Sequence, residues 1–231
     1  MSTIDVIWDS FDDTVMDALW LSLRVSVLAA LACLPVGVLI GAWLARTRSR
    51  WRLLVDLVVT APLVVPPVVT GLVILVVVTR LGVPVAYTWW GAVIAGAIVA
   101  LPLLVRTVRA SVEVMDPRLP LAAATLGASR LGIFLTITLP LSWRGVVGGM
   151  VLAWARAAGE FGATIVVAGN TPGRTQTLPL AIYSALQSPE GTAVWPPVSL
   201  AVAMSVVAVV MSEWLVRRGG GRADHAYRRH P

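Results

Sequence analysis

Long runs of apolar residues set the strongest limit on what this chain can fold into. The runs cover residues 18–44, 53–79, 89–105, 146–168 and 197–216. About 20 mostly apolar residues, coiled as an α-helix, are enough to cross the roughly 30 Å of hydrocarbon in a bilayer. The pattern therefore predicts an all-α, polytopic membrane protein with about five transmembrane helices.

The composition points to the same class of protein. Hydrophobic residues make up 58% of the 231 residues and charged residues only 13%, whereas a soluble domain carries about a quarter charged residues. All 18 lysine and arginine side chains are arginine, and they stand beside apolar runs. Membrane topology explains them better than binding to nucleic acid does. Cys33 lies inside an apolar run, so neither a disulfide framework nor a metal site is expected.

The distribution of arginine predicts the orientation of the chain. Fourteen arginines follow the first run, separate the third from the fourth, or follow the fifth, and only Arg80 and Arg174 fall on the opposite side. Positive residues favour the cytoplasmic side of a membrane. We therefore expect an external acidic segment at 1–17, a transmembrane domain at 18–216 with a cytoplasmic loop at about 106–145, and a basic cytoplasmic tail at 217–231.

Residues 121–140, LAAATLGASRLGIFLTITLP, are too polar and too interrupted to span a membrane. Asp116 is a candidate N-cap in front of a short helix, and Gly127 is a candidate left-handed residue at its end. A second short helix should start at about Ser129 and be broken by Pro140 before the next span. We call residues 121–140 the elbow. An interfacial amphipathic helix and a docking surface for another protein both fit this pattern.

The elbow resembles the cytoplasmic loop of permease subunits in bacterial ABC importers. The motif of that family reads Glu-Ala-Ala, three residues, Gly, nine residues, Ile-x-Leu-Pro. The residues that match in register are Ala122, Ala123, Gly127, Ile137, Leu139 and Pro140, with Leu121 at the position of the Glu. In the family this loop forms a coupling helix that docks on the ATPase, and the resemblance implies the same role here. Leu121 removes any polar contact that the Glu would make.

The resemblance extends over nearly the whole chain. The stretches APLVVPPVVTG at 61–71 and ARAAGEFGATIVVAGNTPGRTQTLPLAIYSALQSPEG at 155–191 are similar to molybdate permeases in particular. This implies a permease that translocates molybdate across the bacterial cytoplasmic membrane by alternating access, with sulfate or tungstate as alternative substrates. The implied partners are a pair of ABC ATPase subunits, an extracytoplasmic oxyanion-binding protein, a second copy of the chain and membrane lipid.

Three prolines interrupt the second apolar run. Pro62, Pro66 and Pro67 each lack a backbone donor and kink a helix. Backbone groups left unpaired at membrane depth are tolerated where they are buried in protein or line a water-filled cavity. Together with the resemblance, this favours a segment that lines the pathway or forms a gate, continued by Thr70 and Gly71. The alternative is a kink that serves packing alone.

An ionisable pair stands in the fourth apolar run. Arg156 and Glu160 are four residues apart and therefore share one helix face. Ionisable groups at this depth are costly and suggest a functional site. Arg156 could attract an oxyanion, but Glu160 beside it would cancel most of that attraction. We therefore predict a structural role for the pair, between helices or across a dimer seam.

The stretch GNTPGRTQTLP at 169–179 is rich in turn-forming and hydroxyl residues. The resemblance implies an outer loop that meets the substrate-loaded binding protein. Asn170 and Arg174 are its candidate contact residues, and a solvated surface arginine is the alternative for Arg174. Asp56, near a span end on the predicted cytoplasmic side, is expected to be interfacial.

The sequence offers no catalytic constellation. It holds no glycine-rich phosphate loop of the Walker type, so ATP hydrolysis is expected in a separate ATPase subunit and no cofactor is expected in this chain. A membrane-embedded enzyme would need convergent titratable groups within the spans, and Arg156 and Glu160 are the only pair on offer. A structural anchor would not need prolines midway through a span.

Overall fold

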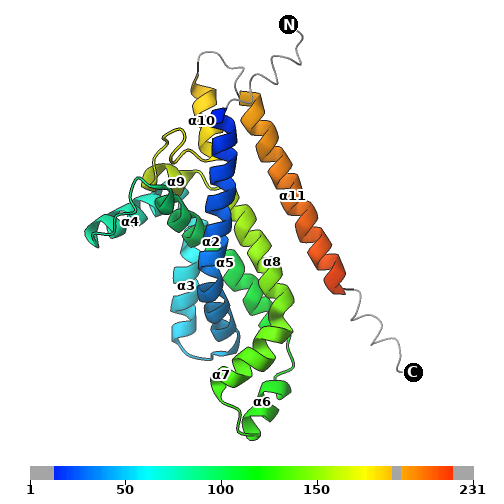
Figure 1. The fold of residues 1–231 in the computed structure, drawn as a ribbon. Coiled ribbons are helices and arrows are strands. Elements are labelled where there is room, and N and C mark those ends of the chain that lie inside the picture. The colour runs from blue at the N-terminus through cyan, green and yellow to red at the C-terminus, as the bar shows by residue number, and fades with distance from the viewer. Residues whose placement is uncertain (1–12, 189–193, 221–231) are drawn as a thin grey trace.

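The computed structural model describes residues 13–188 and 194–220, and nearly all of them are helical (Figure 1). The elements are α2 (Asp13–Arg46), α3 (Trp51–Val64), α4 (Pro67–Arg80), α5 (Trp89–Glu113), α6 (Arg118–Thr125), α7 (Arg130–Ile133), the π-helix η1 (Phe134–Thr138), α8 (Leu139–Ala158), α9 (Gly162–Val167), α10 (Leu178–Gln187) and α11 (Trp195–Gly220). No strand occurs in the described part of the chain. The all-α prediction is confirmed. Most of the predicted external segment and basic tail lies outside the described residues.

The core of the molecule lies where α2, α5 and α8 pack against one another. Small residues permit this packing because they let helix backbones approach closely. A Cβ atom on Gly96 of α5 would lie 3.2 Å from the Cβ of Ala29 on α2 and 3.4 Å from the Cβ of Ala157 on α8. Gly96 therefore sits at the junction of the three helices.

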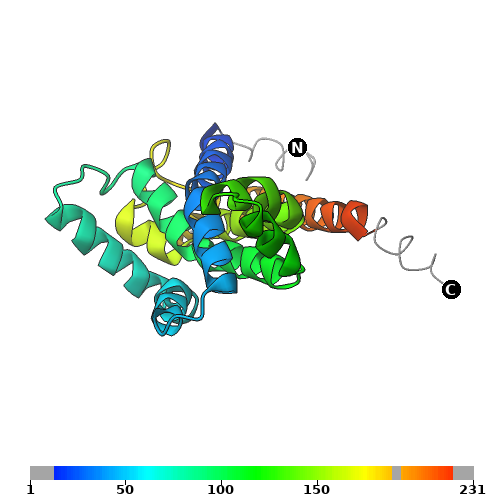
Figure 2. The same cartoon turned by 90° about the horizontal axis from the view of Figure 1, so that it is seen from below.

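The helices reproduce the predicted spans with different bounds. Within the described residues, three helices are long and apolar enough to cross a membrane: α2, α5 and the continuous helix Arg130–Ala158. The pair α3 and α4 would add a fourth span if it crosses as one broken helix. The fifth predicted run lies within α11, a helix of 26 residues. Figure 2 shows α11 on one side of the bundle and α3 and α4 on the other.

Two predicted spans are not continuous helices. The helix axis turns by 116° between α3 and α4, where Pro66 adopts an extended conformation and cannot donate a backbone hydrogen bond. The fourth predicted span, 146–168, ends as a helix at Ala158 and resumes as the short α9 after residues 159–161. The interruption of the second run by its prolines agrees with the prediction, whereas the expectation of one continuous helix at 146–168 was wrong.

The elbow and the loop between α9 and α10 lie at opposite ends of the bundle. In Figure 1, α6 and α7 of the elbow lie at the lower end, whereas α10 and the start of α2 lie at the upper end. The loop between α9 and α10 is anchored there, because the backbone N–H of Leu178 donates to Oγ of Ser22 on α2 at 2.6 Å. The elbow and this loop can therefore meet different partners at the same time.

Candidate functional site

The elbow begins with an exposed helix. None of the residues of α6 is buried, and the side chains of Leu121 and Leu126 are 65% and 88% exposed. Ala122 is also exposed, and Ala123 is half-buried. Exposed leucines beside small alanines form an apolar surface that another protein can approach closely. The matching motif residues at the start of the elbow therefore lie together on an accessible part of the molecule.

The turn at the end of α6 has the predicted left-handed conformation. Gly127 has a φ of +85°. Its N–H donates to the carbonyl of Ala124 at 3.1 Å, and the N–H of Ala128 donates to the carbonyl of Ala123 at 3.0 Å. These two bonds form a Schellman motif. The left-handed conformation explains why this residue is glycine, since residues with a Cβ are strained there.

Both helices of the elbow begin close to their predicted places. The carboxylate of Asp116 accepts a hydrogen bond from the N–H of Arg118 at 2.9 Å, although α6 starts one residue later than predicted and Pro117 occupies the N-cap. Ser129 caps α7, because its hydroxyl accepts from the N–H of Gly132 at 3.1 Å. The predicted start of a second helix at about Ser129 is confirmed.

Pro140 does not break the helix, contrary to the prediction. The elbow continues through α7, η1 and α8 as a single helix, Arg130–Ala158. The π-turn η1 makes this continuity possible: the N–H of Leu139 donates five residues back, to the carbonyl of Phe134. The widened turn accommodates a residue that has no N–H to donate. Ile137, Leu139 and Pro140 therefore belong to a helix that runs directly into the core.

The second halves of the two broken helices, α4 and α9, contact each other. A Cβ atom on Gly162 would lie 2.8 Å from the Cβ of Pro67, and one on Gly71 would lie 2.8 Å from the Cα of Ala163. The start of α4 thus packs against α9 with no room for larger side chains. Thr70, the neighbour of Gly71 on α4, is buried, and its hydroxyl has no hydrogen-bond partner among the described residues. Of the predicted gate residues, only Pro62 lies on the other side of the break, in α3.

Arg156 and Glu160 form an ion pair, with 2.8 Å between Nη1 and Oε2. The Glu160 side chain is 2% exposed and the Arg156 side chain 30%. The other carboxylate oxygen of Glu160 accepts from the N–H of Ala163 at 2.9 Å. Glu160 therefore also caps α9, a function that the helical spacing did not reveal. An acidic residue two positions before the first residue of a short helix was the available sequence signal.

The loop between α9 and α10 separates the two residues predicted to act in it. The Asn170 side chain donates to Oγ of Ser184 at 2.8 Å and accepts from Nε2 of Gln176 at 3.0 Å. Asn170 is therefore occupied inside the loop. Arg174 is exposed and makes no ion pair among the described residues. Its guanidinium remains available to a partner.

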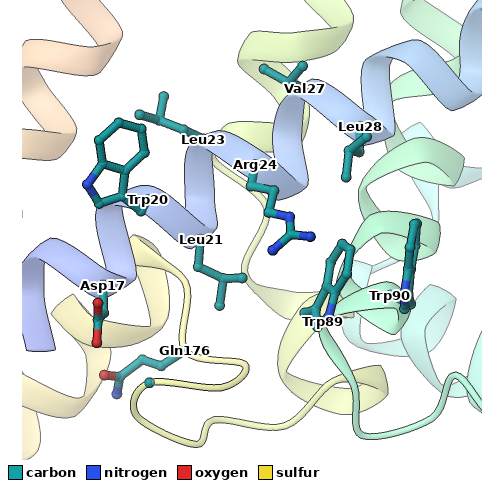
Figure 3. Close-up of a pocket in the computed structure, with 11 residues that line it drawn as sticks. Asp17, Trp20, Leu21, Leu23, Arg24, Val27, Leu28, Trp89, Trp90 and Gln176 are labelled. Carbon is teal, nitrogen blue, oxygen red and sulfur yellow. The ribbon is translucent and has the colours of Figure 1, made fainter.

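A groove of about 860 Å³ opens beside this loop (Figure 3). The guanidinium carbon of Arg24 lies 4.2 Å from the ring centroid of Trp89, a separation typical of cation–π contact. Asp17, Trp20 and Gln176 line the same groove. Sequence reasoning missed this site because Arg24 and Trp89 lie on different helices.

Ion pairs join α3 to α5 near the elbow. Arg109 lies 3.0 Å from Asp56 and 2.8 Å from Glu113, and Arg52 lies 3.2 Å from Glu113. Asp56 is half-buried and thus serves in a network that holds the first half of the broken helix against α5. Among the described residues, no three histidine, cysteine, aspartate or glutamate side chains lie together so that they could hold a metal ion.

Known proteins resemble this chain along most of its length. The family model of the binding-protein-dependent transport system inner membrane component matches residues 37–219. The molybdenum transport system permease ModB of Escherichia coli K12 is 41% identical over 223 residues, which cover 91% of this chain and 97% of that protein. ModB of Haemophilus influenzae is 42% identical over 215 residues, covering 88% and 94%.

Solved transporter structures share the fold. The structure described as inward-facing conformations of the MetNI methionine ABC transporter matches with a TM-score of 0.71 at 17% identity, covering 94% of this chain and 99% of that one. A bacterial ABC transporter involved in the import of alginate matches with a TM-score of 0.64 at 15% identity, covering 96% and 85%. The chain therefore belongs to the family of inner membrane components of binding-protein-dependent transport systems.

Proposed function

We propose that this protein is the membrane-spanning permease of an ATP-driven importer that translocates molybdate across the bacterial cytoplasmic membrane. The observation that carries the proposal is the 41–42% identity to molybdenum transport permeases over nearly their full length. The fold supports it, because an exposed elbow and an exposed loop lie at opposite ends of a bundle of apolar helices. Such an arrangement suits a protein with one partner on each side of a membrane.

The elbow is the proposed contact with the ATPase. Leu121, Ala122 and Ala123 would dock in the partner, and Gly127 would keep the shape of the docking surface. The helix that follows is 29 residues long, or about 40 Å at 1.5 Å per residue. Because the helix continues past Pro140 through a π-turn, a displacement of the elbow would be transmitted into the core. This makes the helix a lever between ATP hydrolysis and the pathway.

The contact between the two broken helices is the proposed gate. Pro62, Pro66 and Pro67 shape the break, and Thr70 and Gly71 bring α4 against α9. The lever ends at this contact, since α8 is joined to α9 through Glu160. The ion pair with Arg156 neutralises Glu160 and fixes the start of α9, so we assign the pair a structural role. Alternating access would then consist of a change in how α4 packs on α9.

The arginine distribution supports an orientation with the elbow in the cytoplasm and the amino terminus outside. In this orientation residues 1–17 are external and residues 217–231 form a cytoplasmic tail. Arg174 then faces the extracytoplasmic oxyanion-binding protein, while Asn170 holds the loop that presents it. A pair of ATPase subunits, a second copy of the chain and membrane lipid complete the proposed assembly.

Uptake of labelled molybdate tests this function. Cells that lack their own molybdate importer would carry this chain together with its ATPase and its binding protein, and excess sulfate or tungstate would be added as a competitor. We expect uptake that depends on this chain and resists sulfate. If modest sulfate abolishes uptake, the assigned substrate becomes sulfate. If tungstate competes but sulfate does not, molybdate and tungstate are both assigned as substrates. The absence of uptake with all partners present would refute the proposal.

A further inference from the structure

A groove of about 570 Å³ opens beside the elbow, where the connection between α2 and α3 meets the ends of α5 and α6. Three arginines, Arg46, Arg48 and Arg52, line it together with two acidic residues, Glu113 and Asp116. The molybdate pathway and the docking surface proposed above make no use of these arginines.

The two carboxylates do not neutralise all of the arginines. Glu113 is shared between Arg52 and Arg109, and one oxygen of Asp116 accepts the N–H of Arg118. Neither Arg46 nor Arg48 has a carboxylate within ion-pair distance among the described residues. The guanidinium of Arg46 donates to Sδ of Met115 at 3.7 Å, and a thioether is a weak acceptor. Two guanidinium groups therefore remain available to an anion.

The positive charge continues into a neighbouring groove. This second groove has a volume of about 530 Å³, and Arg46 and Thr47 line both grooves. It adds Arg130 from α7, which is exposed and makes no ion pair with the described residues. The cationic surface thus links the end of α2 to both helices of the elbow.

Exposed apolar side chains flank the arginines. Trp43 lines the second groove, and Trp51 and Leu53 at the start of α3 are 58% and 68% exposed. Tryptophan is enriched at the headgroup level of membranes, and arginine stems cover apolar surface while their heads stay polar. An inorganic anion or an acidic peptide would leave these side chains in water. A molecule with an anionic head and acyl chains would satisfy both parts of the surface.

We propose that this groove binds the headgroup phosphate of an anionic phospholipid, with phosphatidylglycerol as the representative ligand. Arg46 and Arg48 supply the charge, and Arg130 extends the site to the elbow. Basic pockets between transmembrane helices are a recurrent way to recognise anionic headgroups. The bound lipid would hold the α2–α3 connection against α6, and so fix the elbow in place. This last consequence rests on the proposed function, whereas the binding itself does not.

Binding is tested on the purified full-length chain in detergent micelles. Thermal unfolding and lipid titration would be measured with phosphatidylglycerol and with phosphatidylcholine. The double variant R46Q/R48Q removes two groove arginines. The matched control is R50Q/R144Q, which removes the same charge from arginines that line neither groove. We expect phosphatidylglycerol to bind R46Q/R48Q about 30-fold more weakly than the control and the wild type.

Each other outcome would overturn the proposal. Equal affinity for phosphatidylglycerol in both double variants would exclude the groove, and equal stabilisation by phosphatidylcholine would exclude recognition of charge. Saturation by inorganic phosphate at the same concentration would assign the site to a free anion. Loss of ATPase association with unchanged lipid affinity would assign the arginines to a protein partner. If R46Q/R48Q does not fold, the single variants R48Q and R50Q provide the same comparison. A failure of molybdate uptake leaves this binding result unaffected.

Discussion

Replacement of Gly127 by valine isolates the contribution of the elbow's turn. A Cβ at Gly127 would meet no atom within 4 Å, so the substitution introduces no clash. Its φ of +85° lies in the region that residues other than glycine rarely adopt. The left-handed conformation costs roughly 1–2 kcal/mol for such a residue, and valine, being β-branched, lies at the upper end. The cost is therefore conformational and local to the turn.

This cost translates into a measurable loss of coupling. At about 1.4 kcal/mol per tenfold, 1–2 kcal/mol corresponds to about 5- to 30-fold. If the ATPase recognises the native turn, its affinity for membranes that carry G127V should fall by that factor, and molybdate uptake should fall with it. Membrane insertion should not change. Co-purification titrated with the ATPase subunit measures the first effect, and labelled uptake measures the second.

Gly82 provides a matched control for this experiment. It has a φ of +67°, and its Cβ would also meet nothing within 4 Å, but it lies between α4 and α5. G82V should therefore carry similar strain without loss of ATPase affinity. G127N should recover most of the affinity, because asparagine tolerates the left-handed region. Undiminished ATPase affinity in G127V, or an equal loss in G82V, would refute the reasoning.

Three further substitutions test the gate, the ion pair and the loop. G162A should lower the free energy of unfolding by about 1–3 kcal/mol in thermal melts, because its Cβ would press on Pro67 at 2.8 Å, whereas G148A, with open space around it, should not. E160Q should destabilise the protein, and R156Q/E160Q should restore part of the loss because no unpaired charge remains. If the losses of R156Q and E160Q simply add in the double variant, Arg156 and Glu160 are not coupled. R174Q should leave the melting temperature unchanged but weaken stimulation of the ATPase by the binding protein, and full stimulation would exclude Arg174 from that contact.

Sequence reasoning was most reliable where the determinants are local. Each apolar run became helical, in one piece or two, because about 20 apolar residues in a row leave a membrane chain few other ways to satisfy its backbone. The left-handed turn at Gly127 and the helix start near Ser129 were predicted correctly, since both depend on residues within one helical turn. Leu121, Ala122 and Ala123 could be placed on a short helix for the same reason.

The conformation of the proline segments required the tertiary structure. A proline in the sequence predicts that one backbone hydrogen bond is missing, but it does not predict how the helix adjusts. At Pro140 the helix continued through a π-turn, whereas at Pro66 it turned by 116°. The difference is that α8 packs along the core formed with α2 and α5, while α4 packs on the separate helix α9. Packing partners far away in the sequence selected the outcome.

The pairing of polar groups was likewise decided by tertiary structure. The spacing of Arg156 and Glu160 predicted their ion pair, because residues four apart on a helix meet. It could not predict that Glu160 also caps α9, since this depends on where the helix ends. The contact of Arg24 with Trp89 and the proximity of Arg46 and Arg48 to the elbow join separate helices. By itself, the sequence thus determined the membrane class, the helices and their local turns; only the packing of those helices decided which charges are paired and which remain free.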